Sequence, residues 1–244
     1  MENNLVVQSN ELVLAAYTMT TKEKQLLLTC ISRIDSRPDA PNITKQTKFT
    51  VTVEEVAKIF YTDSTKKNAF RDLEQASNRL FDSEVLIALE DNKTLRTRFV
   101  SGVLYDPNGD QITITFAEDV LPYLTQLKAN FTKYRLMEVS ELSSIHSMRL
   151  YELIVCWVGQ YQYTKSMDLD DFRYVMGIKG KYKQFGQLRE RVIETAIDEV
   201  NESTNYKITV EYHKKSRGIG YEGLTLIFHR KTLDKLTSED GTLS

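Results

Sequence analysis

The sequence predicts an α+β fold of two tandem winged-helix domains, each a helix-turn-helix followed by a β-hairpin. One structural order occurs twice: an apolar-faced helix, a short helix with an acidic start, a helix with a basic start, and alternating strands. Placing Arg71 on Arg191 aligns the two copies, with Leu73, Ala76, Leu80 and Ser83 on Ile193, Ala196, Val200 and Ser203. Because a winged helix places its last helix in a DNA groove, two in tandem predict a reader of an extended DNA site.

The length fits one large domain or two small ones, and the repeat favours two, without a membrane segment. The 244 residues suit domains at 1–129 and 130–232, with 233–244 as a flexible tail. Apolar runs stay well short of the ~20 residues of a membrane span, and the first four residues lack the basic start of a signal peptide. We therefore expect a cytoplasmic protein without membrane contact. Cys30 and Cys156 fall within apolar helical patterns and are predicted to be buried free thiols.

The first copy divides into elements by its apolar spacing and its turn residues. Thr20 or Thr21 can cap its first helix, and Thr52 its second, where Glu54 and Glu55 occupy the first turn favoured by the helix dipole. The predicted elements are a short strand or arm (12–16), helices over 21–34, 53–60 and from 63 or 64, strands over 85–90, 95–105 and 111–116, and a short helix over 118–127.

The second copy follows the same order. The predicted elements are a helix from Ser143 or Ser144 to residue 158, helices over 169–176 and from about 185 to 202, and hairpin strands over 206–212 and 224–228. Asp168 is expected to cap the second of these helices and Gly177 to end it. Capping explains Asp168, Asp170 and Asp171 better than a cation site does.

Basic residues gather where a winged helix meets DNA, although the net charge is −2 and the pI about 6.0. The candidate DNA-binding residues of the second copy are Lys179, Lys181, Tyr182, Lys183, Gln187, Arg189 and Arg191 before and in its last helix, and Lys214, Lys215 and Arg217 at its hairpin tip. Those of the first copy are Lys66, Lys67, Asn68 and Arg71 near a helix start, and Arg96 and Arg98 on one strand face.

Side-chain chemistry suggests how these residues divide the work. Arginine grips guanine with two hydrogen bonds and glutamine can address adenine, so Arg189, Arg191 and Gln187 are expected to read bases. The loop lysines and Tyr182 suit phosphates. Two alternatives stay open: the helix is a solvated amphipathic surface, or the hairpin uses its lysines against edge aggregation.

Enzymatic motifs are weak, and we expect no catalytic residues, no metal and no cofactor. The stretch from Val175 to Tyr182 fails the phosphate-loop pattern, because its first glycine position is Val175 and its last position is Tyr182. Three histidines occur without a His-x-His pair, and no Cys/His cluster has zinc spacing.

Several stretches share the order and sequence of a known family. They are Asn10–Leu12, Thr21–Leu28, Phe131–Tyr134, Leu142–Ser144, Ser147–Leu153, Asp170–Phe172, Lys181–Tyr182 and Leu188–Ile193. Together they resemble theta-type plasmid replication initiators of the RepB kind. The resemblance implies a monomer that binds origin direct repeats (iterons), a dimer that represses its own gene at an inverted operator repeat, and host partners such as helicase and its loader. It places Arg149 in a helix core, where an architectural role is expected.

Other functions remain open from sequence alone. The nearest is a tandem winged-helix transcriptional regulator without origin function. A rolling-circle nickase is disfavoured because the sequence lacks a histidine pair. A protein-interaction scaffold stays open because the pI is low for a DNA-binding protein. For self-association, we expect the strands over 85–116 to form the contact.

Overall fold

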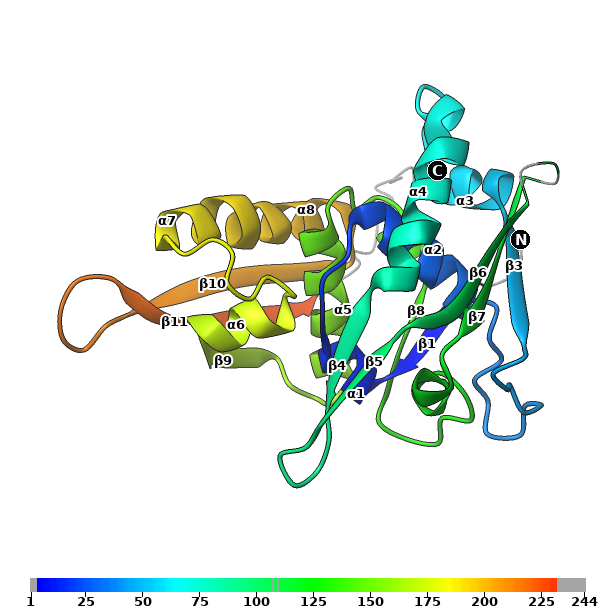
Figure 1. The fold of residues 1–244 in the computed structure, drawn as a ribbon. Coiled ribbons are helices and arrows are strands. Elements are labelled where there is room, and N and C mark those ends of the chain that lie inside the picture. The colour runs from blue at the N-terminus through cyan, green and yellow to red at the C-terminus, as the bar shows by residue number, and fades with distance from the viewer. Residues whose placement is uncertain (1–3, 107, 109, 232–244) are drawn as a thin grey trace, which may run out of the picture.

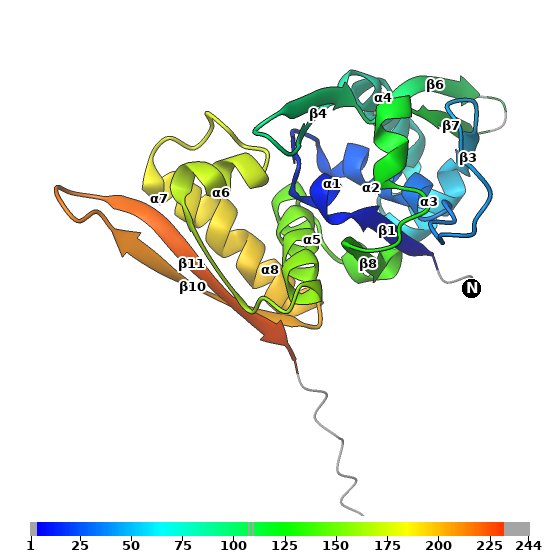
Figure 2. The same ribbon diagram turned by 90° about the horizontal axis from the view of Figure 1, so that it is seen from below.

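The computed structural model describes residues 4–106, 108 and 110–231, so the expected tail over 233–244 lies outside the described residues. Two mixed units lie side by side, and α5 (Ile145–Gly159), the first helix of the C-terminal unit, lies at the centre of the molecule next to the N-terminal unit (Figure 1). Seen from below, the C-terminal unit narrows into a long hairpin that points away from the N-terminal unit (Figure 2). This architecture has the order of elements that the sequence repeat predicts.

The N-terminal unit combines three longer helices with short strands. Its elements are β1 (Leu5–Ser9), α1 (Asn10–Leu14), β2 (Ala16–Tyr17), α2 (Thr21–Ile31), β3 (Lys48–Thr52), α3 (Val53–Phe60), α4 (Ala69–Asp82), β4 (Glu84–Ala88), β5 (Thr94–Arg98), β6 (Val100–Asp106), β7 (Gln111–Phe116) and β8 (Phe131–Arg135). Three 3-10 helices join them, over Lys66–Asn68, Glu118–Tyr123 and Leu136–Val139.

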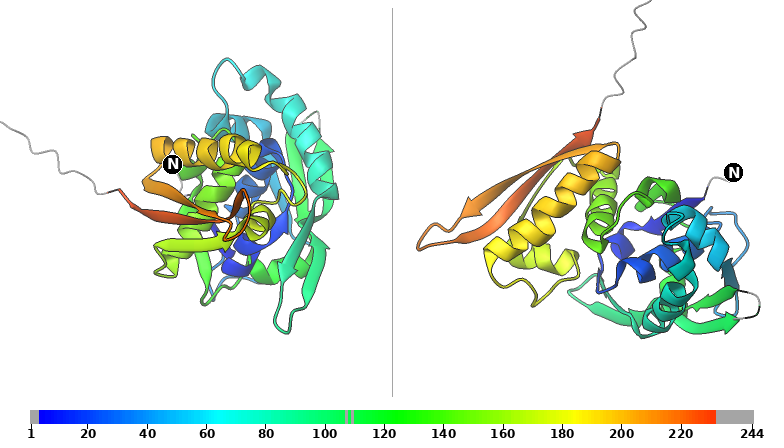
Figure 3. Two further views of the ribbon diagram at one scale, coloured as in Figure 1. Left: turned by 90° about the vertical axis from the view of Figure 1, so that its left-hand side faces the viewer. Right: turned by 90° about the horizontal axis from the view of Figure 1, so that it is seen from above.

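The C-terminal unit starts with α5 and repeats the helix-turn-helix and hairpin order. Its further elements are β9 (Thr164–Asp168), α6 (Leu169–Val175), α7 (Phe185–Leu188), a π-helical stretch (Arg189–Glu194), α8 (Thr195–Ser203), β10 (Tyr206–Lys214) and β11 (Tyr221–Arg230). The segment from α7 to α8 is one continuous helical body (Figure 3).

The predicted helix caps are confirmed. The side chains of Thr20 and Thr52 accept from backbone amides three residues on, and Glu23 and Glu55 complete both capping boxes. Ser144 caps α5, and Asp168 caps α6 by accepting from the amides of the next two acidic residues. Polar side chains thus satisfy amides that a helix start leaves without intrahelical partners.

Several predicted boundaries are wrong, each for a local reason. Residues 12–16 are mostly helical, because the Ser9 hydroxyl accepts from the Leu12 amide and starts α1. The helix over 21–34 ends at Ile31. The helix expected from 63 or 64 starts at Ala69, after a 3-10 turn, and the helix over 118–127 is a 3-10 helix that contains Pro122.

Within the described residues the strands form four small sheets, of order β1–β8, β2–β4–β5, β3–β7–β6 and β9–β11–β10. The predicted strand over 95–105 breaks at the buried Phe99, so β5 and β6 belong to different sheets and residues 85–116 do not form a single sheet. The expected domain boundary at 129/130 stays a prediction, although β8 lies beyond it and pairs with β1.

The two aligned helices bury equivalent positions. Leu73, Ala76 and Leu80 of the first copy are buried against α2, and Ile193, Ala196 and Val200 of the second lie on the buried side of the helix packed on α5. The predicted register between the copies therefore reflects one packing arrangement used twice. Cys30 and Cys156 are buried and free, as expected, and burial raises the pKa of the Cys30 thiol to about 12.

Candidate nucleic-acid interface

The helical body from Phe185 to Ser203 has one buried and one exposed side. Leu188, Val192, Ala196 and Val200 are buried, because their spacing of four residues places them on one stripe. Gln187 and Arg191 are exposed on the other side, near the N-terminal end. That end is the part of a helix-turn-helix that contacts base edges.

A π-helical stretch lies within this body, at Arg189–Glu194. The Thr195 hydroxyl donates to the Glu190 carbonyl oxygen at 2.7 Å. This bond spans five residues, as the backbone hydrogen bonds of a π-helix do. Arg189 is half-buried and ion-paired with Glu190 (3.3 Å) and Glu194 (3.4 Å). By contrast, Arg191 is exposed and has no ion pair within the described residues. Of the two arginines, Arg191 is therefore the one whose guanidinium is available.

The loop before this helix contains three exposed lysines and three residues with left-handed backbone conformation. Residues Gly177, Gly180 and Tyr182 have φ values of +68°, +78° and +49°, in the left-handed region. Arg173 donates to the Tyr182 carbonyl oxygen at 3.2 Å and so ties the loop to α6. The predicted Lys179, Lys181 and Lys183 are all exposed here.

The hairpin of β10 and β11 contacts the start of the helical body at Phe185 through aromatic side chains. The rings of Phe185 and Tyr221 stack with centroids 4.2 Å apart, and Tyr212 meets Phe185 edge-on at 5.2 Å. The hairpin tip carries the exposed Lys214, Lys215 and Arg217. The structure thus brings the loop, the helix start and the hairpin of the C-terminal unit into one basic region.

The basic residues before α4 and in its first turn are exposed but partly paired. Lys66 lies 3.0 Å from Asp63, and Arg71 lies 3.2 Å from the neighbouring Asp72. Lys67 is exposed and Asn68 is half-buried, both in the 3-10 turn that precedes the helix. This group occupies the position equivalent to the loop and helix start of the second unit.

The two arginines of β5 point to the same face, as expected. Arg96 forms a bidentate pair with Glu84 across the sheet, with nitrogen–oxygen distances of 2.7 to 3.0 Å. Arg98 donates to the Phe81 carbonyl oxygen at 3.2 Å. Both side chains thus have partners within the protein, and phosphate contact there requires these bonds to be shared or exchanged.

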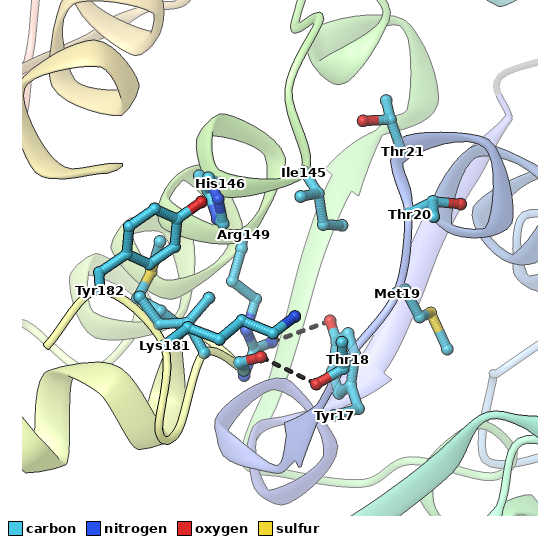
Figure 4. A pocket seen from close by; sticks show the side chains of 13 residues that line it. Tyr17, Thr18, Met19, Thr20, Thr21, Ile145, His146, Arg149, Lys181 and Tyr182 are labelled. Carbon is cyan, nitrogen blue, oxygen red and sulfur yellow. Dashed lines mark hydrogen bonds between the residues drawn. The ribbon is translucent and has the colours of Figure 1, made fainter. Parts of the chain in front are cut away.

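A cavity of about 280 Å³ lies where the two units meet (Figure 4). Its walls come from the strand-to-helix segment before α2, the start of α5 and the loop before α7. Lys181 and the ring of Tyr182 line one side, and His146 packs edge-on against Tyr182. Burial and the neighbouring Lys181 ammonium lower the pKa of His146. Lys181 thus lies between the loop before α7 and the segment before α2 of the N-terminal unit.

Beneath this cavity, a buried polar cluster joins the units. Arg149 donates to the carbonyl oxygens of Ala15 and Val175 and to the Tyr17 hydroxyl. Lys24 and Glu152 complete the cluster at 2.8 Å from each other. The architectural role expected for Arg149 agrees with these contacts, because its side chain is only 2% exposed. The sequence did not predict this pair, because no local pattern distinguishes Lys24 or Glu152 from other charged residues of a helix.

The described residues show neither a membrane-crossing helix nor a metal cluster. Within 4–106, 108 and 110–231, no helix is both long and apolar enough to span a bilayer. Over the same ranges, no three His, Cys, Asp or Glu side chains are grouped to hold an ion.

Two family models match the chain along the two units. A model described as Initiator Replication protein, WH1, matches residues 5–155, which is more than half of the chain. A model described as Initiator Rep protein, WH2, matches residues 168–222. The chain belongs to the initiator replication protein family. The predicted resemblance to plasmid replication initiators with two winged-helix domains is thereby confirmed.

Individual relatives agree with this assignment. A replication initiation protein of Escherichia coli is 26% identical over 221 residues, which cover 86% of this chain but only 66% of that relative, just under two thirds. An uncharacterized 27.6 kDa protein of Escherichia coli is 23% identical over 208 residues, covering 82% of this chain and 85% of that protein.

A solved structure shows the same fold. The crystal structure of Pi initiator protein in complex with iteron DNA matches with a TM-score of 0.76 at 18% identity, covering 96% of this chain and 100% of that chain. At this identity the likeness concerns the fold. It confirms that this initiator family member consists of two tandem winged-helix units.

Proposed function

We propose that this initiator binds repeated sequences at a plasmid origin as a monomer, with one recognition helix from each unit in successive major grooves. The helical body from Phe185 to Ser203 supplies most base readout, and α4 adds contacts on the same duplex. Loading of several copies would then open the origin and recruit host helicase and its loader.

The observation that carries this proposal is the amphipathic recognition helix of the C-terminal unit. Its stripe from Leu188 to Val200 is buried, while Gln187 and Arg191 face outward at the N-terminal end. Exposed lysines precede that end in the chain, and the cationic hairpin packs against it through Tyr221 and Phe185. Phosphate contacts from these cations would set the register in which the helix reads bases.

Self-association would use the N-terminal unit. β6 lies at the edge of the β3–β7–β6 sheet and exposes Leu104 to 60%. An edge strand with an exposed apolar side chain can pair with a second copy. A dimer formed in this way would bind an inverted operator repeat and repress the initiator's own gene.

Selection of bound duplexes from a random pool tests the proposal, followed by a salt titration on the selected duplex. We expect an enriched motif of about two helical turns, with affinity falling steeply as salt rises. Direct copies of that motif in a plasmid origin would identify an initiator, whereas isolated copies beside promoters would favour the regulator. Recovery of unselected sequences would contradict specific binding altogether.

A further inference from the structure

The tip of the β10–β11 hairpin presents an isoleucine to solvent. Ile219 is 100% exposed, more than any other large apolar residue among those described. Single exposed apolar residues are common on protein surfaces, so exposure alone assigns no role. The position and the neighbours of Ile219 make it distinctive.

Hairpin folding does not require an isoleucine at this place. Gly218 and Gly220, on either side, have φ values of +87° and +117°, and the Lys215 amide donates to the Gly220 carbonyl oxygen at 3.1 Å. The glycines make the turn, whereas isoleucine is β-branched and is not among the residues that favour turns. Its side chain contributes no core packing, because it is wholly exposed.

The tip is held at a defined place relative to the recognition helix. Phe185, the first residue of α7, stacks on Tyr221, the first residue of β11. Tyr212 packs against both rings, at 5.2 and 6.0 Å. From this base the hairpin extends beyond the helices of its unit (Figure 2).

The surroundings of Ile219 are cationic. Lys214, Lys215 and Arg217 are exposed, and none of them forms an ion pair within the described part of the chain. An apolar side chain beside free cations matches a nucleic-acid groove, where phosphates line the edges and base steps form the floor. Proteins that bend DNA insert apolar wedges of this kind into the minor groove.

We propose that Ile219 is such a wedge: it enters the minor groove beside the site read by Gln187 and Arg191, partly unstacks one base step and bends the duplex. The cations of the tip hold the phosphates on either side. This inference rests on the proposed DNA binding of the C-terminal unit and adds a deformation of the DNA to it.

The test compares the full chain with Ile219→Ser and Ile219→Met on the selected duplex, with Met137→Ser as a matched control at another exposed apolar residue. The duplex carries end-to-end fluorophores for bending and 2-aminopurine at successive steps for unstacking. We expect the full chain, Ile219→Met and Met137→Ser to bend the duplex and raise 2-aminopurine fluorescence at one step. Ile219→Ser is expected to retain base specificity without either signal.

A mismatch at the responsive step sharpens the result. Because a mismatched step unstacks more easily, the full chain should bind that duplex about tenfold more tightly, while Ile219→Ser gains nothing. Equal bending by the full chain and Ile219→Ser would overturn the wedge while leaving specific binding intact. A changed monomer–dimer equilibrium of Ile219→Ser without DNA would overturn it in favour of self-contact. Failure of the full chain to select any duplex would instead contradict the proposed function.

Discussion

The ammonium nitrogen of Lys24 lies 2.8 Å from Oε2 of Glu152, and both side chains are almost wholly buried. Lys24 belongs to α2 of the N-terminal unit and Glu152 to the central α5. Glu152 also accepts from Tyr134 at 2.7 Å and from Gln8 at 2.8 Å, so β8 and β1 meet at the same carboxylate. The Tyr17 hydroxyl of β2 donates to the same carboxylate at 3.4 Å, so one carboxylate connects five elements.

Removing this carboxylate should be severely destabilising. Glu152→Ala leaves Lys24 and Arg149 buried without their counter-charge, and we expect it to lower the free energy of unfolding by about 3–5 kcal/mol. Urea denaturation measures this. The control is Glu84→Ala, which breaks the exposed pair with Arg96 and should cost less than about 1 kcal/mol. Equal losses of unfolding free energy in the two variants would show that the buried pair stabilises the fold no more than the exposed pair does.

The same pair predicts how stability depends on pH. Burial alone would raise the pKa of the Glu152 carboxyl, but attraction to Lys24 and Arg149 holds it below its ordinary 4.5. Burial alone would lower the pKa of Lys24, but Glu152 raises it above 10.5. The contribution of Glu152 is thus present above pH 4.5 and is lost as pH falls through its folded pKa. That of Lys24 is complete below pH 10.5 and is lost as pH rises through its folded pKa.

Unfolding free energies measured from acid to alkaline pH should therefore be highest between these limits. Glu152→Gln should reduce the loss of unfolding free energy at acid pH only in part, because Glu199 also has a lowered pKa. Burial alone would raise the pKa of Glu199, but hydrogen bonds from Ser143 and Ser147 outweigh burial. If Glu152→Gln lost stability at acid pH to the same extent as the unchanged protein, Glu152 would not be a source of the acid dependence.

Gly177 is predicted to be irreplaceable where the loop before α7 meets the N-terminal unit. Its φ is +68°, and a Cβ there would lie 1.8 Å from the Tyr17 carbonyl oxygen. Gly177→Ala should therefore cost more than about 2 kcal/mol in unfolding experiments. Gly180→Ala is the matched control: φ is +78° with nothing within 4 Å, so only the backbone cost of about 1 kcal/mol is expected. Equal effects of the two variants would contradict the close approach to Tyr17.

Arg191 is predicted to read a base rather than a phosphate. Arg191→Ala should weaken binding to the selected duplex by about 1–3 kcal/mol and leave binding to random DNA almost unchanged. Competition gel shifts measure both affinities, with Arg37→Ala as the control at an exposed arginine in the loop after α2. The same loss on both kinds of DNA would reassign Arg191 to the phosphate backbone.

Local signals in the sequence predicted much of this fold. Thr20, Thr52, Ser144 and Asp168 cap helices because a hydroxyl or carboxylate at those positions accepts from a nearby amide, which needs no tertiary information. The stripe from Leu188 to Val200 follows equally from helical spacing. The basic loop, helix start and hairpin tip could likewise be recognised as one exposed region once a winged helix was expected.

The remaining features depend on contacts distant in sequence. β1 pairs with β8 more than 120 residues away, and the two-residue β2 is too short to leave a pattern. No local pattern predicted the burial of Lys24. It is buried because β1, β3, α4 and α5 surround α2, which is buried from Glu23 to Ile31. The ion pairs of Arg189 also depend on the π-helical turn, which no residue pattern in the sequence predicts.

Chemical footprinting on the selected duplex tests most directly the claim that both units read one site. Methylation interference and hydroxyl-radical cleavage should show two major-groove segments about one helical turn apart on one face of the DNA. Arg191→Ala should remove interference in one segment and leave the other in place. A single protected segment, or two that Arg191→Ala weakens equally, would contradict tandem readout by the two winged-helix units.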